Sequence, residues 1–188
     1  MVYKKITGEI ELELVSPHNV EEVYTIVENN REYLAEYLNW LDKTKSSEDV
    51  YQNTRNALSR FADKKGIDYV IKKNGRIIGR ISIWQTNEDA KVYEIGYWIV
   101  KEQSRKGIMT LCAKEMLKVG IEYLKAEKFE IYCIAENTGS NKVARKLGFT
   151  HEGTIRNSIK VNERLFSMNV FGLLKDEYLK NNVALSNQ

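Results

Sequence analysis

One segment near the middle of the chain strongly constrains the fold. An apolar stretch at residues 97–100 leads into a basic turn at Arg105 and Lys106, and an amphipathic helix is expected directly after Gly107. Apolar side chains recur along this helix every three or four residues: Ile108, Leu111, Cys112, Met116, Val119 and Tyr123. The segment therefore predicts a strand, a glycine turn and a packed helix in direct succession.

The turn has the chemistry of an anion-binding site. The first N–H groups of a helix have no partner within it and carry a partial positive charge. Arg105 and Lys106 stand beside these groups, and Gly107 lets an anion approach the backbone without meeting a Cβ. Basic residues before a glycine also occur in ordinary solvated loops, so the turn alone leaves both interpretations open.

Length and composition predict one domain over residues 1–188, with residues 183–188 as a frayed tail. The formal charge of +3, from 29 basic and 26 acidic residues, gives no reason to expect nucleic acid as a partner. No signal peptide or membrane-length apolar run is apparent, so a cytoplasmic protein without a membrane partner is expected. Cys112 and Cys133 fall on apolar faces and indicate core packing, not a disulfide or a metal site.

Periodicity along the chain predicts a mixed α/β fold. Strands are expected at residues 9–15, 68–73, 76–84, 91–100, 128–135, 149–157 and 163–174, and helices at residues 18–41, 46–65, 108–125, 140–148 and 176–182. The pair Asn74 and Gly75 between two apolar runs predicts a hairpin. The expected architecture is a mixed, mostly antiparallel twisted sheet of about seven strands with helices on both faces.

Four segments in their order resemble the GNAT family of N-acetyltransferases: residues 94–99, 103–110, 136–149 and 151–156. More narrowly, they resemble the branch that acetylates the amino termini of ribosomal proteins, and the resemblance covers about residues 10–178. It implies the GNAT fold with splayed central strands, acetyl-coenzyme A as cosubstrate, no metal, and direct acetyl transfer to an amine.

The resemblance also implies where the coenzyme binds. Its diphosphate is expected on the turn formed by Arg105, Lys106, Gly107, Ile108, Met109 and Thr110, and its pantetheine along Trp98, Ile99 and Val100. Asn137, Asn141 and Arg145 are expected to contact the coenzyme or line its far side. Ser104 stands where the family has Gln or Arg, and Met109 where it has Gly or Ala. One side-chain donor to phosphate is therefore lost unless Gln103 or Arg105 substitutes for it.

Two residues are candidates for proton transfer. Glu94 is the candidate base, acting directly or through a water, because strand alternation places it on the same face as Trp98; a bulge at Gly96 would change that parity. The alternative is a sheet carboxylate paired with Lys or Arg. Ser140 is the candidate donor to the leaving thiolate, and its alternative role is a helix cap. The N–H of Ile99 or Val100 would polarise the thioester carbonyl.

The acetyl acceptor is the least determined part. Ile159 and Ser167 stand where relatives of the ribosomal type often carry acidic residues. A peptide α-amine is the leading acceptor, with a small amine (polyamine, amino acid or antibiotic) as the alternative, and a non-catalytic coenzyme-binding module as a third interpretation. The resemblance also suggests a homodimer that uses the last hairpin, although the sequence does not decide the oligomeric state.

Overall fold

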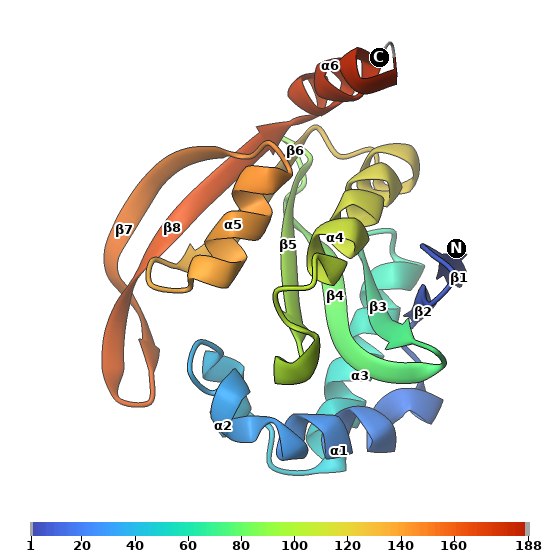
Figure 1. Ribbon diagram of the computed structural model, residues 1–188, viewed down its shortest axis with the longest axis vertical. Coiled ribbons are helices and arrows are strands. Elements are labelled where there is room, and N and C mark those ends of the chain that lie inside the picture. Colours follow the sequence, from blue (N-terminus) through green and yellow to red (C-terminus); the bar gives the residue numbers. More distant parts are fainter. Residues whose placement is uncertain (1, 187–188) are drawn as a thin grey trace.

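The computed structural model describes the backbone of residues 2–186 and the side chains of residues 2–180. Within this range the chain forms an eight-stranded sheet in the order β1-β2-β3-β4-β5-β6-β8-β7 (Figure 1). Neighbouring strands of the described sheet are antiparallel except for β5 and β6. The strands are β1 (Tyr3–Lys5), β2 (Ile10–Leu14), β3 (Gly66–Lys73), β4 (Arg76–Asn87), β5 (Val92–Ile99), β6 (Lys128–Ile134), β7 (Thr150–Val161) and β8 (Arg164–Leu174).

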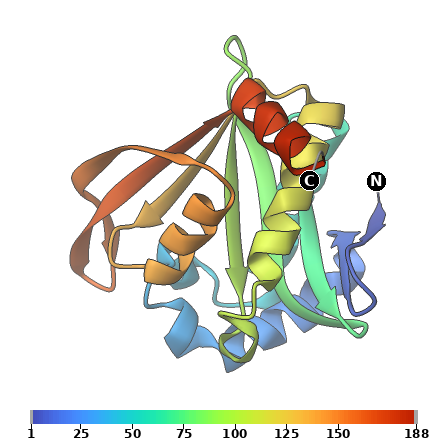
Figure 2. The same ribbon diagram turned by 45° about the horizontal axis from the view of Figure 1, so that its top comes forward.

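Helices cover both faces of the sheet (Figures 1 and 2). One face carries α4 (Ile108–Val119), η4 (Gly120–Leu124) and α5 (Thr138–Lys146). The other face carries η1 (Pro17–Asn19), α1 (Val20–Asn29), α2 (Arg31–Leu34), η2 (Asn39–Lys43) and α3 (Ser47–Ala62). Strand alternation divides the apolar residues between two cores, so that Tyr69 and Ile95 pack with α4 while Val70 and Trp98 pack with α1 and α3.

This architecture confirms the predicted fold class. The hairpin between β3 and β4 is also confirmed, because Asn74 and Gly75 both have positive φ angles, 49° and 77°. Strand β1 adds to the seven strands expected. Its three residues are too few to show an alternating pattern, and they become a strand by pairing with β2, Tyr3 opposite Glu13.

The expected single helix over residues 18–41 is wrong, because the chain bends at Asn30. Asn30 has φ −120° and ψ 14°, and its Nδ2 donates to the carbonyl of Ile26 at 3.0 Å. Such side-chain bonds to the backbone compete with helix continuation. The segment is therefore split into α1, α2 and η2, and the bend brings Trp40 against the sheet, 6.4 Å from Trp98 between ring centroids.

The carboxyl-terminal segment forms helix α6 (Lys175–Ser186), longer than the expected helix at residues 176–182. Residues 183–186, which were expected to belong to a frayed tail, continue this helix, and residues 187–188 lie outside the described part of the chain. In Figure 1, α6 lies beyond one end of the sheet, at the opposite end from α1 and α2.

Candidate active site

The two parallel strands at the centre of the sheet separate after three residue pairs. The pairs are Val92 with Lys128, Tyr93 with Phe129, and Glu94 with Glu130. Beyond them β5 continues to Ile99 paired with β4, while β6 continues to Ile134 paired with β8. Figure 2 shows the two strands diverging, and we call the opening between residues 95–99 and 131–134 the fork.

The backbone of β5 presents hydrogen-bonding groups to the fork. The N–H groups of a strand alternate between its two neighbours. The N–H of Val100 donates to the carbonyl of Ile78 at 2.9 Å, on the β4 side, so those of Ile99 and Tyr97 point toward the fork. Of the two amides expected to polarise the thioester, Val100 is thus already engaged by Ile78, and Ile99 is the better placed. By the same alternation Trp98 turns its N–H toward β4.

The turn before α4 has the backbone geometry of an anion site. Gly107 is the residue before the helix and has φ 80°, and Arg105 has φ 60°, so both lie in the left-handed region. Successive amides in such mixed conformations form a concave site for anions. A Cβ at position 107 would meet no atom within 4 Å, so the φ angle and not lack of space favours glycine in this turn.

Most side chains around this turn are either buried in the core or bonded to neighbouring residues of the turn. Those of Ile108 and Met109 are buried in the core, which leaves only their backbone N–H groups for an anion. Lys106 reaches Gln103 with Nζ to Oε1 at 3.4 Å, and Thr110 follows in the first turn of α4. The hydroxyl of Ser104 donates to the carbonyl of Lys101 at 2.8 Å, an internal turn contact.

Glu94 lies on the face expected from alternation. The register between β4 and β5 is continuous from Gln85 to Gly79, with Gly96 opposite Ser82, so no bulge changes the parity of Glu94. Trp84 is opposite Glu94, and its ring lies 2.8 Å from where a Cβ at Gly96 would stand. The glycine therefore makes room for Trp84 beside Glu94.

The environment of Glu94 suits a base. Burial, and after it the negative charge of the nearby Glu130, together raise the pKa of Glu94 from its ordinary value of 4.5 to about 7. Among the side chains that the structure describes, no Lys or Arg forms an ion pair with Glu94. This favours the base over the alternative of a paired sheet carboxylate, because a base near pH 7 matches proton transfer at neutral pH.

Ser140 lies on the opposite face of the sheet, in the first turn of α5. Its hydroxyl is 3.0 Å from that of Tyr97, while its N–H donates to Oδ1 of Asn137 at 3.0 Å. Asn137 is therefore the helix cap, and the hydroxyl of Ser140 is left for another role. Burial raises the pKa of Tyr97, which keeps that phenol protonated as a second donor. Alternation along β5 was the signal that could have identified Tyr97 from the sequence.

Two residues expected beside the coenzyme make contacts within the protein. Asn141 donates from Nδ2 to the carbonyls of Ile134 at 3.0 Å and Asn137 at 2.7 Å, and its Oδ1 accepts from Asn169 at 2.7 Å. These bonds join α5 to β6 and β8, so Asn141 has a structural role here. Arg145 is exposed and lies over the ring of Phe171, 5.2 Å from its centroid. A coenzyme contact by either residue remains a prediction.

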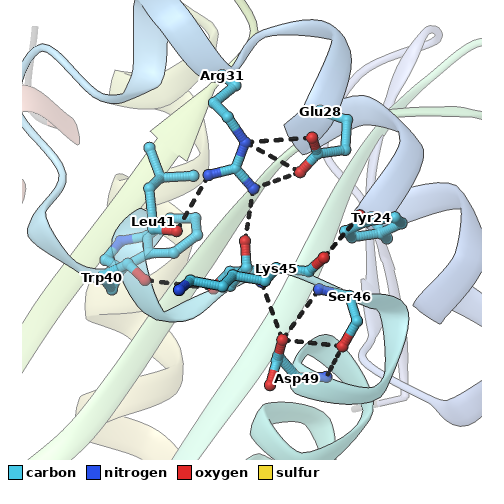
Figure 3. A network of polar contacts seen from close by, with 9 residues as sticks. Tyr24, Glu28, Arg31, Trp40, Leu41, Lys45, Ser46 and Asp49 are labelled. Atoms are coloured by element: carbon cyan, nitrogen blue, oxygen red, sulfur yellow. Dashed lines mark hydrogen bonds and ion pairs between the residues drawn. The ribbon is translucent and has the colours of Figure 1, made fainter.

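The roof over the Glu94 face, formed by α1, α2 and η2, is held by Arg31 (Figure 3). Its guanidinium donates to the carbonyl of Leu41 at 3.0 Å and to that of Thr44, and it pairs with Glu28. The hydroxyl of Tyr24 donates to the carbonyl of Lys45 at 3.0 Å. Because several bonds converge on residues 41–45, η2 is fixed against α1; no local sequence pattern indicated this role of Arg31.

The hairpin of β7 and β8 closes the site from the other side. Near its tip, Nδ2 of Asn162 donates to the carbonyl of Ala35 in the roof at 2.7 Å. Ile159 packs at a small apolar cluster that includes Phe166, and the hydroxyl of Ser167 accepts the N–H of Asn157 at 3.3 Å. The two positions at which the family resemblance favours acidic residues thus serve packing and backbone bonding.

Two absences concern the described residues alone. Within residues 2–186 no helix is both long and apolar enough to span a membrane. Among the described side chains, no cluster of three or more His, Cys, Asp or Glu residues is arranged to hold a metal ion.

The order of these features matches a known family. The family model described as acetyltransferase (GNAT) domain matches residues 9–150, which include the fork, Glu94 and the turn at Gly107. The chain belongs to the GNAT acetyltransferase family. As a GNAT enzyme it is an acyltransferase.

Relatives of this GNAT chain agree along nearly its whole length. The putative ribosomal N-acetyltransferase YdaF of Bacillus subtilis is 28% identical over 176 residues, 93% of this chain and 96% of that protein. The ribosomal-protein-serine acetyltransferase of Escherichia coli is 25% identical over 172 residues, 92% of this chain and 96% of that protein. A structure of a RimL ribosomal-protein acetyltransferase in complex with coenzyme A superposes with a TM-score of 0.88 at 22% identity, covering 93% of this chain and 99% of that one, and so shows the same fold.

Proposed function

We propose that this chain transfers the acetyl group of acetyl-coenzyme A to the α-amine at the amino terminus of a protein, with a ribosomal protein as the expected acceptor. The observation that carries the proposal is the partly buried carboxyl of Glu94, with its pKa raised to about 7, at the closed end of a fork whose open end adjoins the amino terminus of α4. The names of the relatives support the acceptor class, and such an acceptor places the reaction in the cytoplasm.

Two parts of the chain bind acetyl-coenzyme A: the turn before α4 binds its diphosphate, and the fork binds its pantetheine arm. When bound, this cosubstrate supplies the thioester that carries the acetyl group. The amides from Gly107 to Thr110 hold the diphosphate, because they have no partners within the helix and carry its positive partial charge. The fork receives the pantetheine arm, where the backbone groups of Tyr97 and Ile99 pair with its amides. The N–H of Ile99 is placed to bond the thioester carbonyl.

The proton transfers are assigned to groups on the two faces of the fork. The amine nitrogen bonds to the acetyl carbon, and Glu94 takes the proton that this nitrogen loses. The carbon–sulfur bond then breaks, and the sulfur takes a proton from the hydroxyl of Ser140, which lies 3.0 Å from the hydroxyl of Tyr97. Solvent returns a proton to Ser140 and removes the proton held by Glu94, so both groups regain their starting states. Alignment of the two reactants in the fork contributes much of the acceleration, on the order of 7–11 kcal/mol in well-oriented systems.

The basicity of Glu94 favours an α-amine as acceptor. An α-amine has a pKa of about 8 and a lysine amine one of about 10.4. A base with a pKa of about 7 is matched to the first and poorly matched to the second. The free amino terminus of a peptide is therefore a better acceptor for this site than a lysine side chain.

Release of thiol from acetyl-coenzyme A tests the proposal. We expect turnover with peptides that carry the amino-terminal sequences of ribosomal proteins, and none with the same peptides already acetylated. Glu94→Gln should slow turnover at least tenfold while the coenzyme dissociation constant stays unchanged in calorimetry.

Three outcomes would change the proposal in different ways. Turnover confined to polyamines, amino acids or antibiotics would keep the enzyme and replace its acceptor. Tight binding of acetyl-coenzyme A without turnover on any amine would make the chain a binding module. An unchanged rate in Glu94→Gln would remove Glu94 as the base.

A further inference from the structure

Glu130 on β6 is the neighbour of Glu94 on the adjacent strand, at the closed end of the fork. The two residues form the last pair of the parallel ladder before the strands separate. Side chains that are paired in adjacent strands point to the same face, and the strands are about 4.8 Å apart. The two carboxyl groups therefore share the face of the sheet to which the acceptor must come.

The carboxylate of Glu130 is held in place by two partners on its own strand. Nζ of Lys128 contacts Oε1 at 3.0 Å, and the hydroxyl of Tyr132 donates to Oε2 at 3.2 Å. Lys128 is itself fixed by Glu152 on β7, whose Oε2 lies 2.8 Å from Nζ. Glu130 is thus anchored through both oxygen atoms, and its position does not depend on Glu94.

The side chains that other strands place near Glu94 are uncharged or are paired with an opposite charge. Its neighbour on β4 is the uncharged Trp84. Farther along the same face, Asp68 of β3 is balanced by Arg80 of β4 at 2.8 Å and by Arg60 of α3 at 3.0 Å. The hairpin positions 159 and 167 are Ile and Ser. At the closed end of the fork, Glu130 bonds Lys128 and Tyr132 on its own strand and is paired with Glu94 on β5. Its negative charge therefore stands beside Glu94.

We propose that Glu130 is a positioning residue for acetyl transfer, whose anchored carboxylate favours retention of the transferred proton on Glu94. A negative charge beside a carboxyl disfavours its ionised form, so Glu94 becomes a stronger proton acceptor. The same charge attracts an acceptor that arrives as an ammonium ion. This inference rests on the proposed function, because it assigns Glu130 a role through Glu94 as base.

The test compares Glu130→Gln with the wild-type enzyme. Glu130→Gln removes the charge and keeps the size of the side chain. We expect the titration midpoint of Glu94, followed by carbon-13 NMR of its carboxyl, to fall by about one pH unit from its value near 7. The acid limb of kcat/KM should move down by the same amount for two peptides whose α-amines differ in pKa. The KM for peptide should rise several-fold, and the coenzyme Kd should not change.

Two further variants separate the role in proton transfer from a structural one. Glu130→Asp keeps the charge and should restore most of the midpoint. Glu127→Gln removes an equal charge that is paired with Lys175 at 2.9 Å, outside the fork, and should leave the midpoint unmoved.

The results distinguish this inference from the proposed function. An unmoved midpoint in Glu130→Gln, or an equal shift in Glu127→Gln, would overturn the role of Glu130. A different outcome is that Glu94→Gln slows turnover while Glu130→Gln changes neither the titration midpoint of Glu94 nor the acid limb of kcat/KM. In that case Glu94 is still the base, and only the role of Glu130 is refuted. A full rate in Glu94→Gln instead removes the base on which the inference rests.

Discussion

At the scale of single residues, the left-handed backbone angle of Gly107 shapes the turn before α4 that we propose as the phosphate site. A φ of 80° costs an ordinary L-residue roughly 1–2 kcal/mol, whereas glycine adopts it freely and asparagine tolerates it. Space is not the constraint, since a Cβ would meet nothing within 4 Å. A side chain at this position would therefore act on the anion more than on the fold.

Gly107→Glu should abolish coenzyme A binding while the protein stays folded, because a carboxylate would stand among the amides that we propose hold the diphosphate. Calorimetry with coenzyme A measures the loss, and far-ultraviolet circular dichroism checks the fold. Gly107→Asn is the matched control, which keeps the left-handed angle without a charge and should retain most of the affinity. Equal affinity in the Glu variant would refute the phosphate assignment.

Glu94 should make the folded protein less stable as the pH rises. Its folded pKa of about 7 lies above the ordinary value of 4.5, so the folded state binds more protons between these values, and stability falls across this window. Glutamine mimics the protonated acid. Urea unfolding should show Glu94→Gln more stable than wild type by about 1–3 kcal/mol at pH 8, with no difference at pH 4.

The exposed Glu32 on α2 supplies the control for that measurement. Glu32→Gln removes a charge of the same kind without a buried environment and should show no pH-dependent gain. A gain for Glu94→Gln that is equal at pH 4 and pH 8 would contradict the raised pKa.

At the scale of elements, the roof depends on bonds from one side chain to the backbone of another segment. Arg31 on α2 binds the carbonyls of Leu41 and Thr44 and so fixes η2, which carries Trp40 to Trp98 (Figure 3). Each such bond to a charged donor contributes a modest amount, and Arg31 is partly exposed. Its main effect is to place the roof rather than to hold the whole fold.

Arg31→Ala should lower stability by about 1–2 kcal/mol and increase hydrogen exchange at residues 39–45 by more than at α3. The KM for acceptor should rise while the coenzyme Kd stays the same, because Arg31 acts on the acceptor face. Arg55→Ala on the exposed side of α3 is the control. The same exchange in both variants would mean that Arg31 does not hold η2.

At the scale of the whole molecule, the sheet consists of two halves joined by a short ladder. Strands β1 to β5 and strands β6 to β8 share three residue pairs in the described sheet, all at the closed end of the fork. A ligand that fills the fork supplies the hydrogen bonds that the missing ladder leaves out. Coenzyme binding should therefore act across both halves.

Hydrogen exchange checks this expectation. Coenzyme A should slow exchange at the amides of Tyr97 and Ile99, which point toward the fork, by tenfold or more. The amides of Trp98 and Val100, on the β4 side, should exchange slowly with or without ligand. Four amides that respond equally would show that the coenzyme does not pair with this edge of β5.

Features that depend only on residues close together in the sequence could be predicted from it. The turn at Gly107, the hairpin at Asn74 and Gly75, and the face of Glu94 follow from local periodicity and backbone preference. The bend at Asn30 was missed, because apolar periodicity continues through it while a single side-chain bond to Ile26 interrupts the helix. The strand β1 was missed because its structure comes from pairing with β2 and not from its own residues.

The sequence by itself determined the fold class, the glycine turn before α4 and the family of this chain, since these rest on patterns that run along the chain. Only the tertiary structure placed Glu130 beside Glu94, opened the fork after that pair, and joined Arg31 to the carbonyls of Leu41 and Thr44. Each of these contacts joins segments that are separate in sequence. They are set by strand order and helix packing, and the periodicity of one segment carries no record of the partner it will meet.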